Sequence, residues 1–263
     1  MLTDQNYLRS NQYRNSFNLD ARAQLHANYS VNRYGWQRWV FEQLDLPESG
    51  RILELGCGPA WLWQENLPRI PAGWEIALSD LSPGMLQAAR ENLGVRPDRF
   101  RFQVADAQQI PFGNHCFDAV IANHMLYHVP DPGRACSEVR RVLAPGGRFY
   151  AATNGRAHLQ ELHDLFAQAG IQDIFGPERG FSLENGGDQL APYFPDVTIR
   201  RYPDGLVVTA AEPLVAYARS VMVPGQGIEA LKEFERIVRE QIEVQGAIRI
   251  AKDSGVLIGR RAE

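Results

Sequence analysis

Two glycines that closely follow a carboxylate could bring the backbone of this chain against a ligand. Residues 51–58 read Arg-Ile-Leu-Glu-Leu-Gly-Cys-Gly, and their apolar residues are typical of a strand at the centre of a parallel sheet. Glu54 places a carboxylate where such strands normally exclude one, while Gly56 and Gly58 permit a tight turn. This combination predicts a site for a nucleotide-like ligand at the end of the strand.

A second carboxylate follows at a spacing that suits a ribose. Asp80 lies 22 residues beyond Gly58, at the end of the apolar segment 75–79, and a carboxylate at this offset can bind ribose hydroxyls. A dinucleotide site would need a third small residue, so that a helix N-terminus can reach the pyrophosphate, and that position holds Trp61. We therefore expect a ligand with a ribose but no pyrophosphate, which disfavours a nicotinamide oxidoreductase.

The pattern resembles the first motif of the class I S-adenosylmethionine-dependent methyltransferases, acidic-x-Gly-x-Gly-x-Gly. Glu54, Gly56 and Gly58 match it, and Ala60 replaces the last glycine. The resemblance covers about residues 50–154 and implies an α/β fold, a Rossmann-like mostly parallel sheet with an antiparallel C-terminal strand. It implies S-adenosyl-L-methionine as cofactor, bound by Glu54, Gly56, Cys57, Gly58, Asp80, Leu81, Met85, Asp106, Ala107 and Asn123.

Three of these residues have particular roles in the resemblance. Asp106 would accept a hydrogen bond from the exocyclic amine of adenine, and the backbone at Asn123 would face the methionine portion and the reaction centre. Met85 would form an apolar side of the adenine pocket, although an apolar residue on a helix can equally belong to the core.

Candidates for proton transfer follow the fourth predicted strand. Methyl transfer from a sulfonium is an in-line displacement, so the protein aligns two partners, excludes water and, where needed, removes a proton. His128 is the first candidate for a general base or acceptor contact, followed by Tyr127 and His124. A metal is not expected, because Met125 occupies the glutamate position of H-E-x-x-H.

Composition limits the other classes of protein to which the chain could belong. The 263 residues carry a formal charge of −4, which offers no basic field for a nucleic acid. The first residues are polar, and no stretch approaches the length of a membrane-spanning helix. The three cysteines are too few and scattered for a disulfide framework or a thiolate metal site. We expect a cytoplasmic protein without a membrane or nucleic-acid partner.

The chain is interpreted as one methyltransferase domain in four segments: an N-terminal helical lid (1–49), the cofactor-binding core (50–154), a partly helical cap and substrate region (155–245) and the final strands (246–263). Strands are predicted at 51–55, 75–79, 100–105, 117–122, 147–153, 197–202 and 206–209, and helices at 36–41, 82–90, 131–143, 156–169, 182–190, 212–222 and 227–244. Residues 252–255 are predicted to be a turn between two short final strands.

The predicted reaction is methyl transfer to an oxygen or nitrogen of a small metabolite. Two alternatives remain open: a C-methyltransferase acting on a conjugated small molecule, and a cofactor-binding subunit without catalysis. The aromatic residues Tyr29, Tyr34 and Trp36 either pack the edge of the sheet or fold over the cofactor as a lid.

Overall fold

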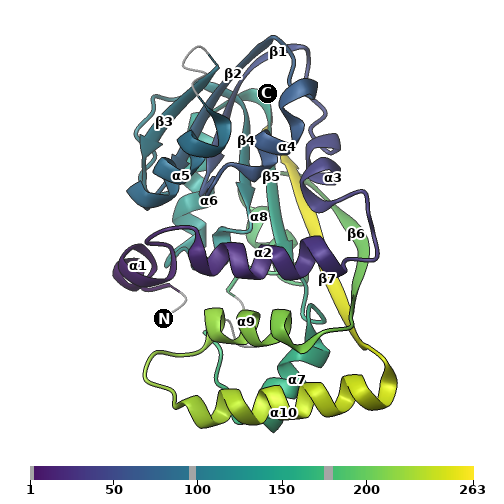
Figure 1. Cartoon of the computed structure of the whole chain (residues 1–263). Helices are drawn as coiled ribbons and strands as arrows, with labels where there is room; N and C mark the ends of the chain where they lie inside the picture. The colour runs from purple at the N-terminus through teal and green to yellow at the C-terminus, as the bar shows by residue number, and fades with distance from the viewer. Residues whose placement is uncertain (1–2, 95–98, 175–179) are drawn as a thin grey trace.

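One seven-stranded sheet organises the protein. A computed structural model (Figure 1) describes residues 3–94, 99–174 and 180–263. The strand order is β3-β2-β1-β4-β5-β7-β6, and β7 runs antiparallel to both of its neighbours. This confirms the Rossmann-like mixed sheet. Its strands are β1 (Ser49–Leu55), β2 (Gly73–Asp80), β3 (Phe100–Val104), β4 (Phe117–Asn123), β5 (Leu143–Asn154), β6 (Asp196–Val208) and β7 (Ile248–Arg260).

Helices cover both faces of the sheet, so the central strands are mostly apolar. One face packs against residues of α3 (Trp36–Glu42), α4 (Trp61–Asn66) and α5 (Pro83–Leu93). The other packs against α6 (Pro132–Val142) and α8 (Gly186–Leu190). The predicted helix starts are confirmed at two caps: the Ser82 hydroxyl accepts from the Met85 amide at 3.4 Å, and the Asp131 carboxylate accepts from the Arg134 amide at 2.9 Å.

A third apolar core lies below the sheet in Figure 1. It is built by α2 (Phe17–Tyr29), α7 (Gln160–Gln168), α9 (Ala211–Val221) and α10 (Ile228–Gln245), together with the projecting ends of β6 and β7. Helix α2 packs against α9, so the N-terminal region contributes to the core of the cap. Residues 175–179 of the predicted cap lie outside the described residues.

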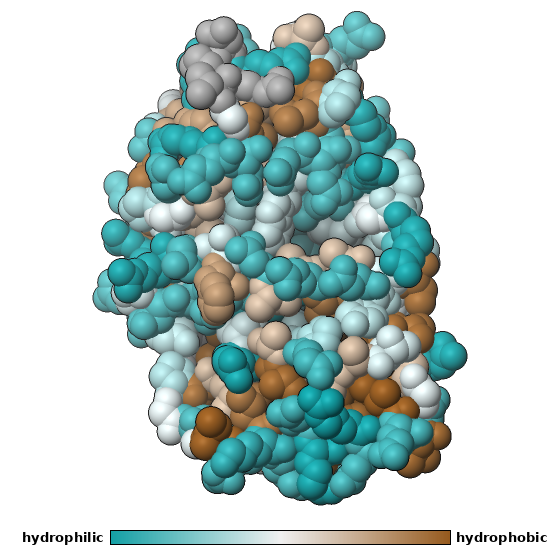
Figure 2. Space-filling model, in the orientation of Figure 1, coloured by the Kyte–Doolittle hydropathy of each residue, from teal (hydrophilic) through white to brown (hydrophobic). Residues whose placement is uncertain are grey.

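The surface of this lower part is mixed. Figure 2 shows hydrophilic side chains alternating with hydrophobic patches over the α9 and α10 end. On α10 the charged residues pair one turn apart, as Arg236 does with Glu233 and Glu240, each at 2.6 Å. Within the described residues, no helix has the length and apolar character needed to span a membrane.

The predicted turn at 252–255 is wrong. These residues lie inside β7, which pairs with β6 without interruption from Asp196 opposite Arg260 to Val208 opposite Ile248. Gly255 permits close approach of the two strands, because a Cβ there would lie 2.5 Å from the Arg200 carbonyl oxygen. The two predicted segments 197–202 and 206–209 are likewise one strand.

The remaining boundary differences are smaller. Helix α7 begins at Gln160 instead of 156, and α8 is confined to Gly186–Leu190 instead of starting at 182. The N-terminal region adds α1 (Gln5–Tyr7) and a π-helix (Leu8–Gln12). Short 3₁₀ turns follow α4 (Leu67–Arg69) and β4 (Leu126–His128).

Candidate active site

The carboxyl ends of the central strands open into a cavity of about 840 Å³. Its walls come from the loops after β1, β2, β3 and β4, from α1 and α2, and from β7. All the residues singled out in the sequence line it: Glu54, Gly56, Cys57, Gly58, Asp80, Leu81, Met85, Asp106, Ala107, Asn123, His124, Tyr127 and His128. The parallel topology brings them together because it directs consecutive strand ends to one edge of the sheet.

Glu54 lies at the bottom of the cavity and is 1% exposed. Its Oε2 accepts a hydrogen bond from the Trp63 indole nitrogen at 2.6 Å. Burial raises the pKa of Glu54 to about 8, although the indole bond opposes the rise. Trp63 is fully buried in the core between sheet and helices. The sequence did not pair Trp63 with Glu54, because the carboxylate and the indole belong to different elements.

The turn after β1 takes left-handed backbone conformations in succession. Gly56 has a φ of +63°, and a Cβ there would lie 2.7 Å from Met125 Cβ. Gly58 follows with a φ of +53°, and Ala60, where the resembled motif has its last glycine, has a φ of +61°. This conformation is unfavourable for an L-residue, so Ala60 retains the backbone geometry of a glycine at a cost in stability. The neighbouring Cys57 thiol is buried, which raises its pKa well above the ordinary value and keeps it unreactive.

Asp80 joins the glycine turn to the start of α5. Its Oδ2 accepts from the Gly58 amide at 3.0 Å, and its Oδ1 accepts from the Ser82 amide at 2.8 Å. Burial raises the pKa of this carboxyl to about 6, against the opposing effect of these bonds. Each carboxylate oxygen has a second lone pair, so ribose hydroxyls could bind without displacing either amide.

Asp106 is engaged by the N-terminal segment. Its carboxylate accepts from the Gln5 side-chain amide at 2.9 Å and from the Gln108 backbone amide at 2.9 Å. Desolvation acts to raise the pKa of Asp106, but the bonds from Gln108 and Gln5 outweigh it and the pKa is lowered. The carboxylate is therefore ionised and able to accept from an amine.

Tyr13 also fixes the N-terminal segment over the cavity. Its carbonyl oxygen accepts from the Ser82 hydroxyl at 2.8 Å, and its phenol oxygen lies 2.8 Å from His128 Nε2. Burial raises the pKa of Tyr13, so the phenol keeps its proton at neutral pH. His128 in turn packs against Tyr127, with ring centroids 4.6 Å apart. The sequence analysis did not connect Tyr13 with His128, because the two residues lie 115 positions apart.

The three aromatic residues of the predicted lid lie in different places. Trp36 lines the cavity, donates to Asn123 Oδ1 at 3.3 Å and lies 4.9 Å from the His124 ring. Tyr29 packs against the third core, and Tyr34 is exposed on the surface, where its hydroxyl bonds to a glutamate. The cover over the cavity is thus supplied by the segment from Gln5 to Tyr13, together with α2.

His124 has a φ of +56°, which is uncommon for a residue other than glycine. Its amide donates to the Ala152 carbonyl at 3.0 Å, so pairing with β5 holds this conformation. Such strain frequently occurs at functional sites.

Within the part of the chain that the structure describes, no group of three metal-binding side chains is placed to hold an ion.

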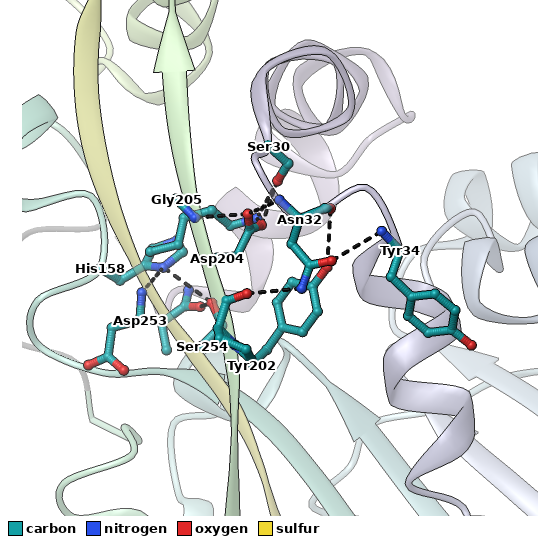
Figure 3. Close-up of polar contacts among 12 residues, drawn as sticks. Ser30, Asn32, Tyr34, His158, Tyr202, Asp204, Gly205, Asp253 and Ser254 are labelled. Atoms are coloured by element: carbon teal, nitrogen blue, oxygen red, sulfur yellow. Dashed lines mark hydrogen bonds and ion pairs between the residues drawn. The ribbon is translucent and has the colours of Figure 1, made fainter.

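The other half of the cavity contains polar residues that the sequence did not single out. They come from β5, α9 and β7, from the segment after α2 and from the segment before α7: Asn32, Asn154, His158, Tyr217, Lys252 and Ser254. His158 Nδ1 accepts from the Asp253 amide at 3.3 Å and lies 3.2 Å from the Ser254 hydroxyl (Figure 3). Lys252 and Ser254 share one face of β7, an alternation that could have identified them had 252–255 been predicted as a strand.

Comparisons with known proteins agree with this geometry. A methyltransferase-domain family model matches residues 53–151. The methyltransferase GfsG of Streptomyces halstedii is 31% identical over 43% of this chain and 41% of its own length. The ubiquinone/menaquinone biosynthesis C-methyltransferase UbiE of Idiomarina loihiensis is 26% identical over 67% and 69%. A malonyl-[acyl-carrier protein] O-methyltransferase of Geobacter sulfurreducens is 28% identical over 74% and 77%.

Solved structures of methyltransferases share this fold. The Haemonchus contortus phosphoethanolamine N-methyltransferase 2, solved in complex with S-adenosyl-L-methionine, superposes with a TM-score of 0.62 at 17% identity, over 100% of this chain and 60% of that one. The sheet order and the ligand-sized cavity at its carboxyl edge define a Rossmann-like cofactor-binding protein. With the matched motif and relatives, residues 53–151 are a class I S-adenosylmethionine-dependent methyltransferase domain, for which S-adenosyl-L-methionine is the cofactor.

Proposed function

We propose that this enzyme transfers the methyl group of S-adenosyl-L-methionine to an oxygen or nitrogen atom of a small polar metabolite. The observation that carries the proposal is the hydrogen bond of 2.8 Å between His128 Nε2 and the Tyr13 hydroxyl at the cavity wall. An oxygen or nitrogen nucleophile loses a proton as it is methylated, and this pair can receive it. The proposed cofactor residues are those predicted from the resemblance, with Asp80 for the ribose and Asp106 for the adenine amine.

The lining of the cavity supports a polar acceptor. Apolar walls with one or two polar groups would suit an aromatic or terpenoid-like molecule. Instead, the half away from the proposed cofactor residues presents amide, hydroxyl, imidazole and ammonium groups, among them Asn32, Asn154 and Ser254. These groups already pair within the protein, as the Ser254 hydroxyl does by donating to Asn154 Oδ1 at 2.7 Å. Hydroxyl and amide groups have further donor or acceptor capacity, which a small molecule with several hydrogen-bonding groups could use and a hydrocarbon could not.

A carbon acceptor is the second candidate. It is favoured by the relatives named as C-methyltransferases, and an acceptor made nucleophilic by conjugation needs only alignment. The named relatives include an O-methyltransferase as well, so they support both acceptor types. Both candidates predict that the cofactor is converted to S-adenosylhomocysteine, whereas a cofactor-binding subunit without catalysis would form none.

The test compares two variants on a panel of polar hydroxyl and amino acceptors. His128→Ala should lower kcat by about 10²–10⁴-fold with cofactor affinity nearly unchanged, whereas Tyr13→Phe, which keeps the ring, should lower kcat less. In wild type, kcat should fall in acid as His128 takes up a proton, and this limb should disappear in His128→Ala. If His128→Ala turns over its true acceptor within a few-fold of wild type, the enzyme works by alignment and the C-methyltransferase hypothesis gains support.

A further inference from the structure

Charge is distributed unevenly across the cavity. The strand ends of β1, β2 and β3 contribute the carboxyl groups of Glu54, Asp80 and Asp106. Helix α2 and strand β7 contribute the basic side chains of Arg22 and Lys252, and α2 also contributes the carboxylate of Asp20. Because Glu54 is protonated at neutral pH, Asp80 and Asp106 supply the negative charge that suits a cationic sulfonium cofactor.

The charge of Lys252 is already compensated. Its Nζ lies 2.5 Å from Asp204 Oδ2 and 3.1 Å from the Ser30 hydroxyl, and the two charged side chains are 7% and 0% exposed. Asp204 also accepts from the amides of Asn32 at 3.0 Å and Gly205 at 2.8 Å (Figure 3). This buried cluster links the segment after α2 to the antiparallel strand pair β6 and β7 and is electrically neutral as a unit. Because Asp204 balances its charge, Lys252 alone does not indicate a site for an anionic ligand.

Arg22 is the other of these two basic groups. It is 7% exposed, and its guanidinium lies 5.6 Å from the centroid of the Tyr13 ring. The guanidinium therefore lies near the proposed proton-accepting pair, on the acceptor side of the cavity. A guanidinium has only donors, arranged to bind a carboxylate or phosphate through two hydrogen bonds.

His26 lies one helical turn after Arg22, on the same face of α2. Its Nδ1 is buried and has no hydrogen-bond partner among the residues that the structure describes. Burial lowers the pKa of His26 to about 3, helped by the charges of Lys252 and Arg22 and opposed by Asp204. The imidazole is consequently neutral, and the net influence of the charges around it is positive.

We propose that the Arg22–His26 face of α2 binds an anionic group, a carboxylate or a phosphate, on the methyl acceptor. The inference rests on the proposed function and specifies its substrate class: a small metabolite that carries an anionic group in addition to the methylated atom. Arg22 holds the anion through its guanidinium, and the neutral His26 ring, in the tautomer with its proton on Nδ1, donates a further hydrogen bond.

The test uses inorganic phosphate and acetate as probes, titrated at constant ionic strength into protein saturated with S-adenosylhomocysteine. At least one probe should bind to wild type, measured by calorimetry and by a rise in melting temperature. Arg22→Met should weaken that binding about 10- to 100-fold, and Arg22→Lys less. Arg33→Met is the matched control, because Arg33 also lines the cavity but is exposed, and it should bind as wild type does.

The outcomes separate this inference from the proposed function. Equal binding of the probe to wild type and Arg22→Met, or no binding of either probe to wild type, overturns the anion subsite even if the enzyme methylates an acceptor. Unchanged S-adenosylhomocysteine affinity in Arg22→Met shows that the variant is folded. A second variant, His26→Gln, retains a donor in place of the imidazole and should bind the probe within a few-fold of wild type, whereas His26→Leu should weaken it. Formation of no S-adenosylhomocysteine from the cofactor with any acceptor would instead contradict the proposed function.

Discussion

Replacing Glu54 by Gln should stabilise the fold while weakening the cofactor site. Glu54 is 1% exposed and has its pKa raised from 4.5 to about 8, chiefly by burial. Each pKa unit corresponds to about 1.36 kcal/mol, so the ionised form is less stable than a neutral carboxyl by up to about 5 kcal/mol. A glutamine side chain at this position would be uncharged, and its carbonyl oxygen could still accept from Trp63. Its additional N–H group needs a hydrogen-bond partner, and leaving that group unpaired would reduce the gain in stability by about 1–2 kcal/mol.

The sign of the pH dependence follows from the raised pKa. Folded Glu54 holds its proton between pH 4.5 and 8, where the unfolded chain has lost it, so the contribution of this group is fully present below pH 4.5 and is lost as the pH rises to about 8. Glu54→Gln should therefore be less stable than wild type by about 1–2 kcal/mol at about pH 4.5 and more stable by roughly 2–4 kcal/mol at about pH 8.5.

Denaturant unfolding at several pH values measures this difference. Glu75→Gln in β2 is the control, because its side chain is 65% exposed, and its stability difference from wild type should stay nearly constant with pH. If the gap between Glu54→Gln and wild type is the same at both ends of this pH range, the buried carboxyl is not the destabilising group. Retention of such a costly residue is expected where function needs it, so cofactor affinity should fall in Glu54→Gln.

Three further outcomes are expected from the turn and its partners. Asp80→Ala should cost about 1.5–3 kcal/mol of cofactor affinity by calorimetry; wild-type affinity should fall as the pH drops through the Asp80 pKa of about 6, and unchanged affinity in the folded variant would exclude a ribose role. Ala60→Gly should raise the free energy of unfolding by about 1 kcal/mol, because the residue has a φ of +61°; a loss of stability in denaturant titrations would contradict this. Gly56→Ala should abolish cofactor-dependent thermal stabilisation, since its Cβ would lie 2.7 Å from Met125 Cβ, and a normal thermal shift would show that the turn adapts.

The core of the fold and the proposed cofactor half of the cavity could be predicted from the sequence. Local signals were sufficient there, because each strand of the βαβ units is a short apolar run and the carboxyl ends of parallel strands meet at one edge. Glu54, Asp80 and Asp106 could therefore be grouped without coordinates. The caps at Ser82 and Asp131 were likewise predictable, since capping depends on residues three apart.

The acceptor half of the cavity depends on contacts that arise only when the chain is folded. Tyr13 and His128 are 115 residues apart, and Lys252 meets Asp204 across a strand pair that looked like turns in the sequence. Gly255 illustrates the reason: a glycine predicts a turn locally, but here the neighbouring Arg200 backbone requires it within a strand. Contacts of this kind depend on how distant segments pack, and packing overrides local preference wherever two backbones or two buried charges must meet.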